Sequence, residues 1–164
     1  QGLEKEDLIK FLPLKNILEK LETYREEGKK IVFTNGCFDV IHAGHTALLR
    51  AAKNHGDVLV VGLNTDKSVS SLKGQGRPFH KLAERAKVLE ELQSVDFIVP
   101  FSTPTPLNLI RKIKPDVLVK GSEYNPDDIV GAETVRSYGG VVTTVPMEGS
   151  LSTSRLLTEL TGSK

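Results

Sequence analysis

Residues 30–45 read KIVFTNGCFDVIHAGH, and this stretch decides the fold. Three apolar residues, two of them β-branched, open it at positions 31–33, which predicts a short buried strand. A turn of small and polar residues around Gly36 follows, and from His45 onward the residues show helical spacing. The stretch therefore predicts a strand, a turn and a helix, which is the first unit of an α/β sheet.

The same alternation continues along the chain. Strands are predicted at residues 30–34, 57–63, 95–100, 116–120 and 140–145, and helices at residues 45–54, 81–92, 105–113, 127–138 and 152–160. Nearly continuous apolar strands separated by helices indicate a parallel sheet that is covered on both faces. The predicted fold class is a three-layer, Rossmann-like α/β domain with five strands.

Two segments stand outside this alternation. Apolar residues at helical spacing from Leu14 up to Gly28 predict an amphipathic helix, so residues 1–29 are expected to form a helical extension of a domain at 30–164. Residues 64–80 are polar and contain three glycines or prolines in close succession, and they are expected to form a long loop. Long loops in compact domains are usually functional.

Composition narrows the function classes. The 164 residues are 38% hydrophobic, carry a formal charge of +1 and include a single cysteine, Cys37. A chain of this size builds a core without metal or disulfide, and its balanced charge does not favour nucleic acid as a partner. The apolar runs are too short to cross a membrane, so a cytoplasmic protein is expected.

His42 and His45 lie where a strand ends and a helix begins. A helix N-terminus presents free N–H groups and a partial positive charge, and imidazole N–H donors beside it could hold phosphate oxygens. The alternative is a helix cap and a surface residue. Half of a metal site is a further alternative, but no cysteine pair or carboxylate lies at suitable local spacing.

The block G36-x-F-D-x-x-H42-x-G-H45 matches a known signature at every position. It resembles the nucleotidyltransferase superfamily that transfers a nucleoside monophosphate to a phosphorylated alcohol or sugar. The resemblance implies that His42 and His45 are catalytic and bind the phosphates. It also implies that the residues around them bind the nucleotide, namely Thr34, Asn35, Gly36, Cys37, Phe38 and Gly44.

Further pieces are similar to one branch, the adenylyltransferases of ADP-heptose synthesis. The pieces that favour this branch are LKGQGRP at 72–78 and VLVKG at 117–121. The branch implies ATP and a heptose 1-phosphate as substrates, Mg²⁺ bridging the phosphates, and often a homodimer, in making precursors of lipopolysaccharide cores or surface glycans. Two alternatives remain: a CTP-dependent cytidylyltransferase acting on glycerol 3-phosphate or another small alcohol phosphate, and a non-catalytic nucleotide-sensing domain.

Several polar residues are candidates for contacts with the substrates. Lys73, expected to be catalytic, and Arg77 lie between glycines and could close over a triphosphate, or they could form a solvated basic loop. Asp39 could orient donors near the phosphates or serve the turn. Asn64 and Asp66 follow the second strand, where they could bind sugar hydroxyls or cap a helix.

The remaining candidates follow later elements. Arg85 could contact phosphates, or could be an exposed partner of nearby glutamates. Lys120 and Gly121 end the fourth strand and are expected at the nucleotide, with Glu123 near the substrate. The helix start at Ser152, Thr153 and Ser154 could cradle phosphate or simply cap the helix.

Overall fold

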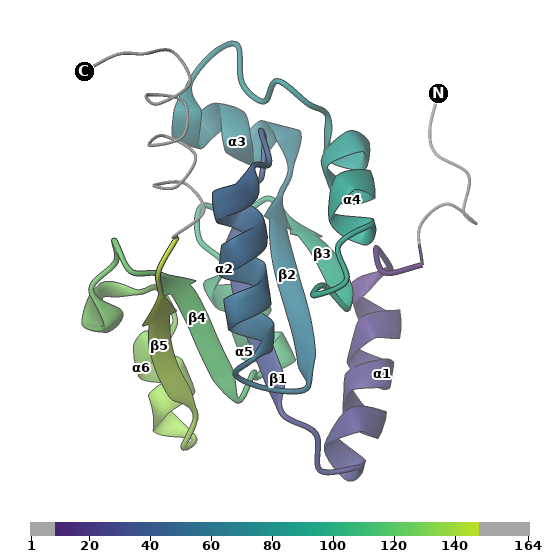
Figure 1. Cartoon of the computed structure of the whole chain (residues 1–164), viewed down its shortest axis with the longest axis vertical. Helices are drawn as coiled ribbons and strands as arrows, with labels where there is room; N and C mark the ends of the chain where they lie inside the picture. Colours follow the sequence, from purple (N-terminus) through teal and green to yellow (C-terminus); the bar gives the residue numbers. More distant parts are fainter. Residues whose placement is uncertain (1–8, 148–164) are drawn as a thin grey trace, which may run out of the picture.

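The computed structural model describes residues 9–147. These residues form a five-stranded, all-parallel sheet in the order β3-β2-β1-β4-β5 (Figure 1). The strands are β1 (Ile31–Gly36), β2 (Val58–Asn64), β3 (Phe97–Phe101), β4 (Val117–Gly121) and β5 (Val141–Val145). The chain builds outward from β1 to β3 on one side and then restarts on the other with β4. The order therefore switches between β1 and β4, where parallel α/β sheets bind ligands.

Helices cover both faces of the sheet, as the sequence predicts. One face carries α2 (Ala43–Lys53) and α4 (Leu82–Glu90), and the other carries α1 (Leu14–Glu26), α5 (Leu107–Ile113) and α6 (Ala132–Ser137) (Figure 1). Each face has its own hydrophobic cluster. Alternate residues of β1 divide between them, because Val32 packs under α2 while Phe33 packs under α5.

The helical extension packs into this same core. Ile17 and Leu21 of α1 are fully buried against the sheet face that α5 also covers. Upstream of α1, Phe11 forms a parallel bridge with Ile98 of the edge strand β3. The buried Glu90 carboxylate accepts backbone N–H groups from residues 9, 10 and 11. The segment before the sheet thus covers the exposed edge of β3.

The loop predicted at residues 64–80 is wrong in its first half, which forms helix α3 (Asp66–Lys73). Thr65 caps this helix, because its hydroxyl accepts the backbone N–H of Ser68 at 3.4 Å. Val69 is fully buried, but the only other apolar residue of this helix, Leu72, is exposed. Eight residues with so few apolar positions give no helical period, so the pattern missed the helix.

The helix predicted at 127–138 is also wrong over its first half. A 3₁₀ turn, η2 (Pro126–Asp128), comes first, and α6 begins only at Ala132. Gly131 separates them with φ of +91°, a left-handed conformation that an α-helix does not allow. A Cβ at Gly131 would also lie 2.7 Å from the Ile110 side chain.

The predicted last helix at 152–160 lies outside the described residues. Among residues 9–147, no helix combines the length and the apolar character that crossing a bilayer requires.

Candidate active site

A cleft of about 510 Å³ opens at the carboxyl ends of β1 and β4, at the switch in strand order. It brings together most of the residues that the sequence predicts. Those that line it are Thr34, Asn35, Gly36, Cys37, Phe38, Asp39, His42, His45, Lys73, Arg77, Lys120, Gly121 and Glu123.

The turn after β1 is shaped by Phe38. Its φ of +47° lies in the left-handed region, which a bulky residue rarely adopts. The ring is buried and lies under Gly36, where an added Cβ would approach it to 2.9 Å. It also lies 5.4 Å from the His45 ring, between ring centroids. Gly36 and Phe38 thus fit each other, and the Phe38 ring packs beside the ring of His45.

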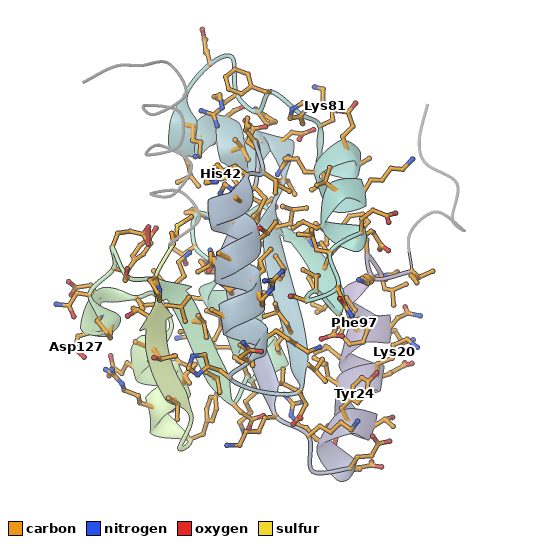
Figure 2. The ribbon with its side chains drawn as sticks, viewed as in Figure 1. Lys20, Tyr24, His42, Lys81, Phe97 and Asp127 are labelled. Carbon is orange, nitrogen blue, oxygen red and sulfur yellow. The ribbon has the colours of Figure 1, made fainter. Side chains whose placement is uncertain are left out.

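The two histidines cap their own helix, as one alternative in the sequence predicts, and they also face the cleft. His42 is the N-cap of α2 (Figure 2), and its Nδ1 accepts the backbone N–H of Gly44 at 3.0 Å. His45 Nδ1 accepts the backbone N–H of His42 at 3.2 Å. Since Nδ1 is an acceptor in both rings, the proton of each neutral imidazole is on Nε2. Capping therefore fixes the tautomer and leaves two Nε2–H donors.

His45 stays neutral well below neutral pH. Burial, followed by the nearby His42 and Lys73, lowers the pKa of His45 from 6.5 to about 4. The two imidazole rings lie 4.1 Å apart between centroids, so a charge on both would be repulsive. At pH 7 His45 is thus a neutral hydrogen-bond donor.

Asp39 anchors the segment that follows α3. Its buried carboxylate accepts Arg77 Nε at 2.7 Å and the backbone N–H groups of Phe79 and His80 at 2.8 and 2.9 Å. Burial opposes ionisation most strongly, but these three donors outweigh it and lower the pKa of Asp39 from 3.8 to about 2. Asp39 thus orients donors at the cleft.

The cations of this segment face the cleft. Lys73 ends α3, which stops at Gly74 with φ of +94°. Arg77 uses Nε for Asp39, and its guanidinium lies over the Phe79 ring at 4.4 Å. Within residues 9–147, no hydrogen bond occupies its two Nη groups. Lys73 and Arg77 together present cationic donors to an anion in the cleft.

Three predicted substrate-binding residues do not line the cleft. The buried guanidinium of Arg85 donates to the carbonyl oxygens of Cys37, Asn64 and His80. Its remaining contact is with Asp66 Oδ1 at 2.7 Å. Asn64 donates its side-chain amide to the Ser68 hydroxyl at 2.7 Å. Arg85 therefore joins the ends of β1 and β2, and it is not the exposed partner of glutamates that the other interpretation expects.

The far side of the cleft is built from β4. Lys120 Nζ donates to the carbonyl oxygen of Asn35 at 2.9 Å and lies 4.9 Å from the Tyr124 ring centroid. Burial lowers the pKa of Lys120, and nearby Glu123 and Cys37 partly oppose this effect. The Glu123 carboxylate lies against Gly121, in the space that a Cβ would occupy.

Cys37 contributes its backbone more clearly than its thiol. Its carbonyl oxygen accepts Arg85 Nη1 at 2.8 Å. Burial raises the pKa of the thiol despite the nearby Lys73 and Arg85, so the thiol is protonated at neutral pH.

Three lining residues were not predicted: Val40, Leu48 and Met147. Leu48 follows His45 by three residues on the same helix, so helical spacing could have indicated it. Met147 follows β5, which pairs with β4, and no local pattern indicates it. Gly44 contributes its N–H to the cap of α2 instead of lining the cleft. Ser152, Thr153 and Ser154 lie outside the described residues.

The donors in this cleft suit an anion more than a metal ion. Within the described residues, no three histidine, cysteine or carboxylate side chains come together in a way that could hold a metal ion. The cleft instead combines two imidazole donors, a lysine and an arginine. Such a set binds phosphate groups.

A parallel sheet with this switch in strand order, and an H-x-G-H helix start facing cationic donors, defines a nucleotidyltransferase. The chain belongs to the cytidylyltransferase-like family, whose model matches residues 33–155. Enzymes of this family typically use a divalent metal ion.

Relatives and a solved structure agree with this assignment. The chain is 51% identical over 147 residues to the bifunctional protein HldE of Gluconobacter oxydans, covering 90% of this chain and 31% of that protein. It is 48% identical over 151 residues to HldE of Methylobacillus flagellatus, covering 92% and 31%. The chain thus spans about a third of the length of these relatives. A lipopolysaccharide core biosynthesis protein of Thermoplasma volcanium superposes with a TM-score of 0.58 at 25% identity, covering 72% of this chain and 97% of that one.

Proposed function

We propose that the domain transfers the adenylyl group of ATP to a heptose 1-phosphate, giving ADP-heptose and pyrophosphate. The observation that carries this proposal is the pair of Nε2–H donors of His42 and His45, fixed by the cap of α2 and facing Lys73 and Arg77 across one cleft. The similarity to HldE over 90% of the chain supports the heptose branch. The similarity in fold to a protein of lipopolysaccharide core biosynthesis supports the same branch.

In this mechanism an oxygen of the sugar phosphate attacks the α-phosphorus of ATP in line with the leaving pyrophosphate. The attacking oxygen forms a bond to the α-phosphorus, which makes the phosphoanhydride of ADP-heptose. At the same time, the bond breaks between the α-phosphorus and the bridging oxygen that leaves with pyrophosphate. A phosphate monoester is already an adequate nucleophile at neutral pH, so no general base is required. Catalysis comes from positioning and from donors aimed at the developing charge.

The chain's own residues divide this work. His42 and His45 donate Nε2–H groups to the α-phosphate oxygens, where negative charge accumulates. Lys73 and Arg77 bind the β- and γ-phosphates and stabilise the departing pyrophosphate. His45 acts here as a hydrogen-bond donor, through the Nε2–H that its cap contact leaves free.

Magnesium is proposed to arrive with the nucleotide. Because residues 9–147 offer no cluster of metal ligands, the triphosphate itself would supply the oxygens that hold the ion. The ion would neutralise phosphate charge.

The test is pyrophosphate release in the presence of magnesium. ATP and CTP are each combined with both anomers of heptose 1-phosphate, with glycerol 3-phosphate and with phosphoethanolamine. Release with ATP and one heptose 1-phosphate supports the proposal. Release with CTP and a small alcohol phosphate would reassign the domain to a cytidylyltransferase, and no release with any pair would leave a nucleotide-binding domain without this activity.

A further inference from the structure

A second, smaller hollow adjoins the cleft at the ends of β1 and β4. It measures about 130 Å³ and shares Asn35, Lys120 and Tyr124 with the cleft. Its other walls come from Pro106, at the start of α5, and from the segment 128–130. Because the two spaces share three lining residues, the hollow lies directly beside the cleft.

The three neighbouring strands place their functional groups in a row. The sheet order puts β1 between β2 and β4. Lys73 and Arg77 belong to the connection after β2, the two histidines follow β1, and Lys120 ends β4. The histidines therefore stand between two cationic regions.

In-line displacement assigns these two regions to different groups. The entering oxygen and the leaving oxygen lie on opposite sides of the reacting phosphorus. If pyrophosphate leaves toward Lys73 and Arg77, the acceptor phosphate enters from the side of Lys120. The rest of the acceptor then extends beyond Lys120, where the smaller hollow lies.

The chemistry of the hollow suits a polyol. Asp128 contributes a carboxylate, and within residues 9–147 this carboxylate has no ion-pair partner, whereas Asp127 pairs with Arg136 at 2.8 Å. The Tyr124 ring offers a face for sugar C–H groups, and Ile129 adds an apolar surface. The negative charge of Asp128 would repel a phosphate, so the phosphate end of an acceptor stays at Lys120.

The segment that carries Asp128 is held in place before any ligand binds. The Asn125 side chain accepts the backbone N–H of Asp127 at 3.0 Å, and the Asn125 carbonyl oxygen accepts that of Asp128 at 2.9 Å. Ile129 is buried against the core. A preformed wall of this kind lowers the entropy cost of binding.

We propose that the hollow beside Asn35 and Tyr124 binds the sugar ring and hydroxyl groups of the acceptor, with Asp128 accepting hydrogen bonds from them. This inference rests on the proposed function. It moves the sugar away from Asn64, Asp66 and Arg85, which do not line the cleft and whose polar groups are bonded to one another, to backbone or to Ser68. It also assigns Asn35 and Lys120, which the sequence places at the nucleotide, to the acceptor.

The test compares Asp128→Asn with Asp127→Asn. Both variants remove one charge from the same exposed turn, but only Asp128 lines the hollow, and Asp127 lies at the outer edge of the molecule (Figure 2). For each variant, KM for heptose 1-phosphate is measured at saturating ATP, and the dissociation constant of ATP is measured without sugar. Since hydrogen bonds to a charged group are involved, Asp128→Asn is expected to raise the sugar KM about tenfold or more, with ATP binding unchanged and Asp127→Asn like the wild type.

A second readout uses a hexose 1-phosphate of the same ring configuration, which lacks the terminal carbon of the heptose. Asp128→Asn is expected to reduce the preference for heptose over hexose, and Asp127→Asn to keep it. Equal sugar KM values in the two variants would overturn the subsite, as would a weakened ATP dissociation constant in Asp128→Asn. Those results leave the proposed function intact, whereas a wild-type protein that is inactive with every heptose phosphate overturns both.

Discussion

Two arginine–aspartate pairs stand at the same edge of the sheet with opposite arrangements. In Arg77–Asp39 the aspartate side chain is 1% exposed and the arginine 27%, at 2.7 Å. In Arg85–Asp66 the arginine is 1% exposed and the aspartate 37%, also at 2.7 Å. The buried Asp39 thus orients Arg77 toward the cleft. The buried Arg85 instead joins three backbone carbonyl oxygens from separate segments. The same pair of residue types gives a cation that faces the cleft in one region and a structural cation in the other.

The largest effect is expected from removing the buried arginine. Arg85→Met leaves three carbonyl oxygens and Asp66 without their partner, so the free energy of unfolding should fall by about 3–5 kcal/mol in urea denaturation. Asp66→Asn is the control, because the Asn side-chain oxygen can still accept from Arg85 and the three carbonyl contacts of Arg85 remain, so the loss should be smaller. A fully stable Arg85→Met protein would contradict the structural role.

The next effect concerns His45, which lines the same cleft as Arg77 and Asp39. His45→Ala removes an Nε2–H from the α-phosphate, so kcat should fall about a hundredfold or more, as with loss of one oxyanion donor. Thr46→Ala, which loses only a hydroxyl contact to Ala43 on the exposed side of the same helix, is the matched control. Near-native turnover in His45→Ala would refute the assignment.

The third prediction concerns the effect of acidic pH on Asp39, whose carboxylate holds Arg77 at the cleft. The folded pKa of Asp39 is about 2 and its ordinary value is 3.8. A lowered folded pKa means that this stabilisation is complete above about pH 4 and is lost as the pH falls toward 2. The loss should be about 2 kcal/mol. Unfolding measured from about pH 5 to about pH 2 should show this slope in the wild type, and Asp39→Asn should lack it.

The smallest effect is expected at the exposed arginine. Arg77→Gln removes a cation from the cleft, so KM for ATP should rise about tenfold, the size of one charge-assisted hydrogen bond. The free energy of unfolding should fall by less than in Arg85→Met, because the buried Asp39 carboxylate keeps the backbone N–H donors of Phe79 and His80. Strong destabilisation with unchanged ATP kinetics would reverse the comparison between Arg77 and Arg85.

Much of the fold was predictable because its signals are local. The apolar runs of β1 to β5 correspond to the strands that the sequence predicts. Helix α3 was missed because its stability comes from the Thr65 cap and one buried valine, not from a periodic apolar face. The helix predicted at 127–138 failed at Gly131, whose conformation depends on contact with α5.

The candidate site likewise combines features with local signals and features that depend on distant residues. The order of residues 30–45 by itself determined a strand, a turn and a helix start with two histidines. These signals are local, and each contact in the cap of the helix joins residues at most three positions apart. Only the tertiary structure decided which arginine faces the cleft. Arg77 and Arg85 meet Asp39 and Asp66 from 38 and 19 residues away, and burial at such distances depends on how α3 and α4 pack on the sheet, which no local pattern specifies.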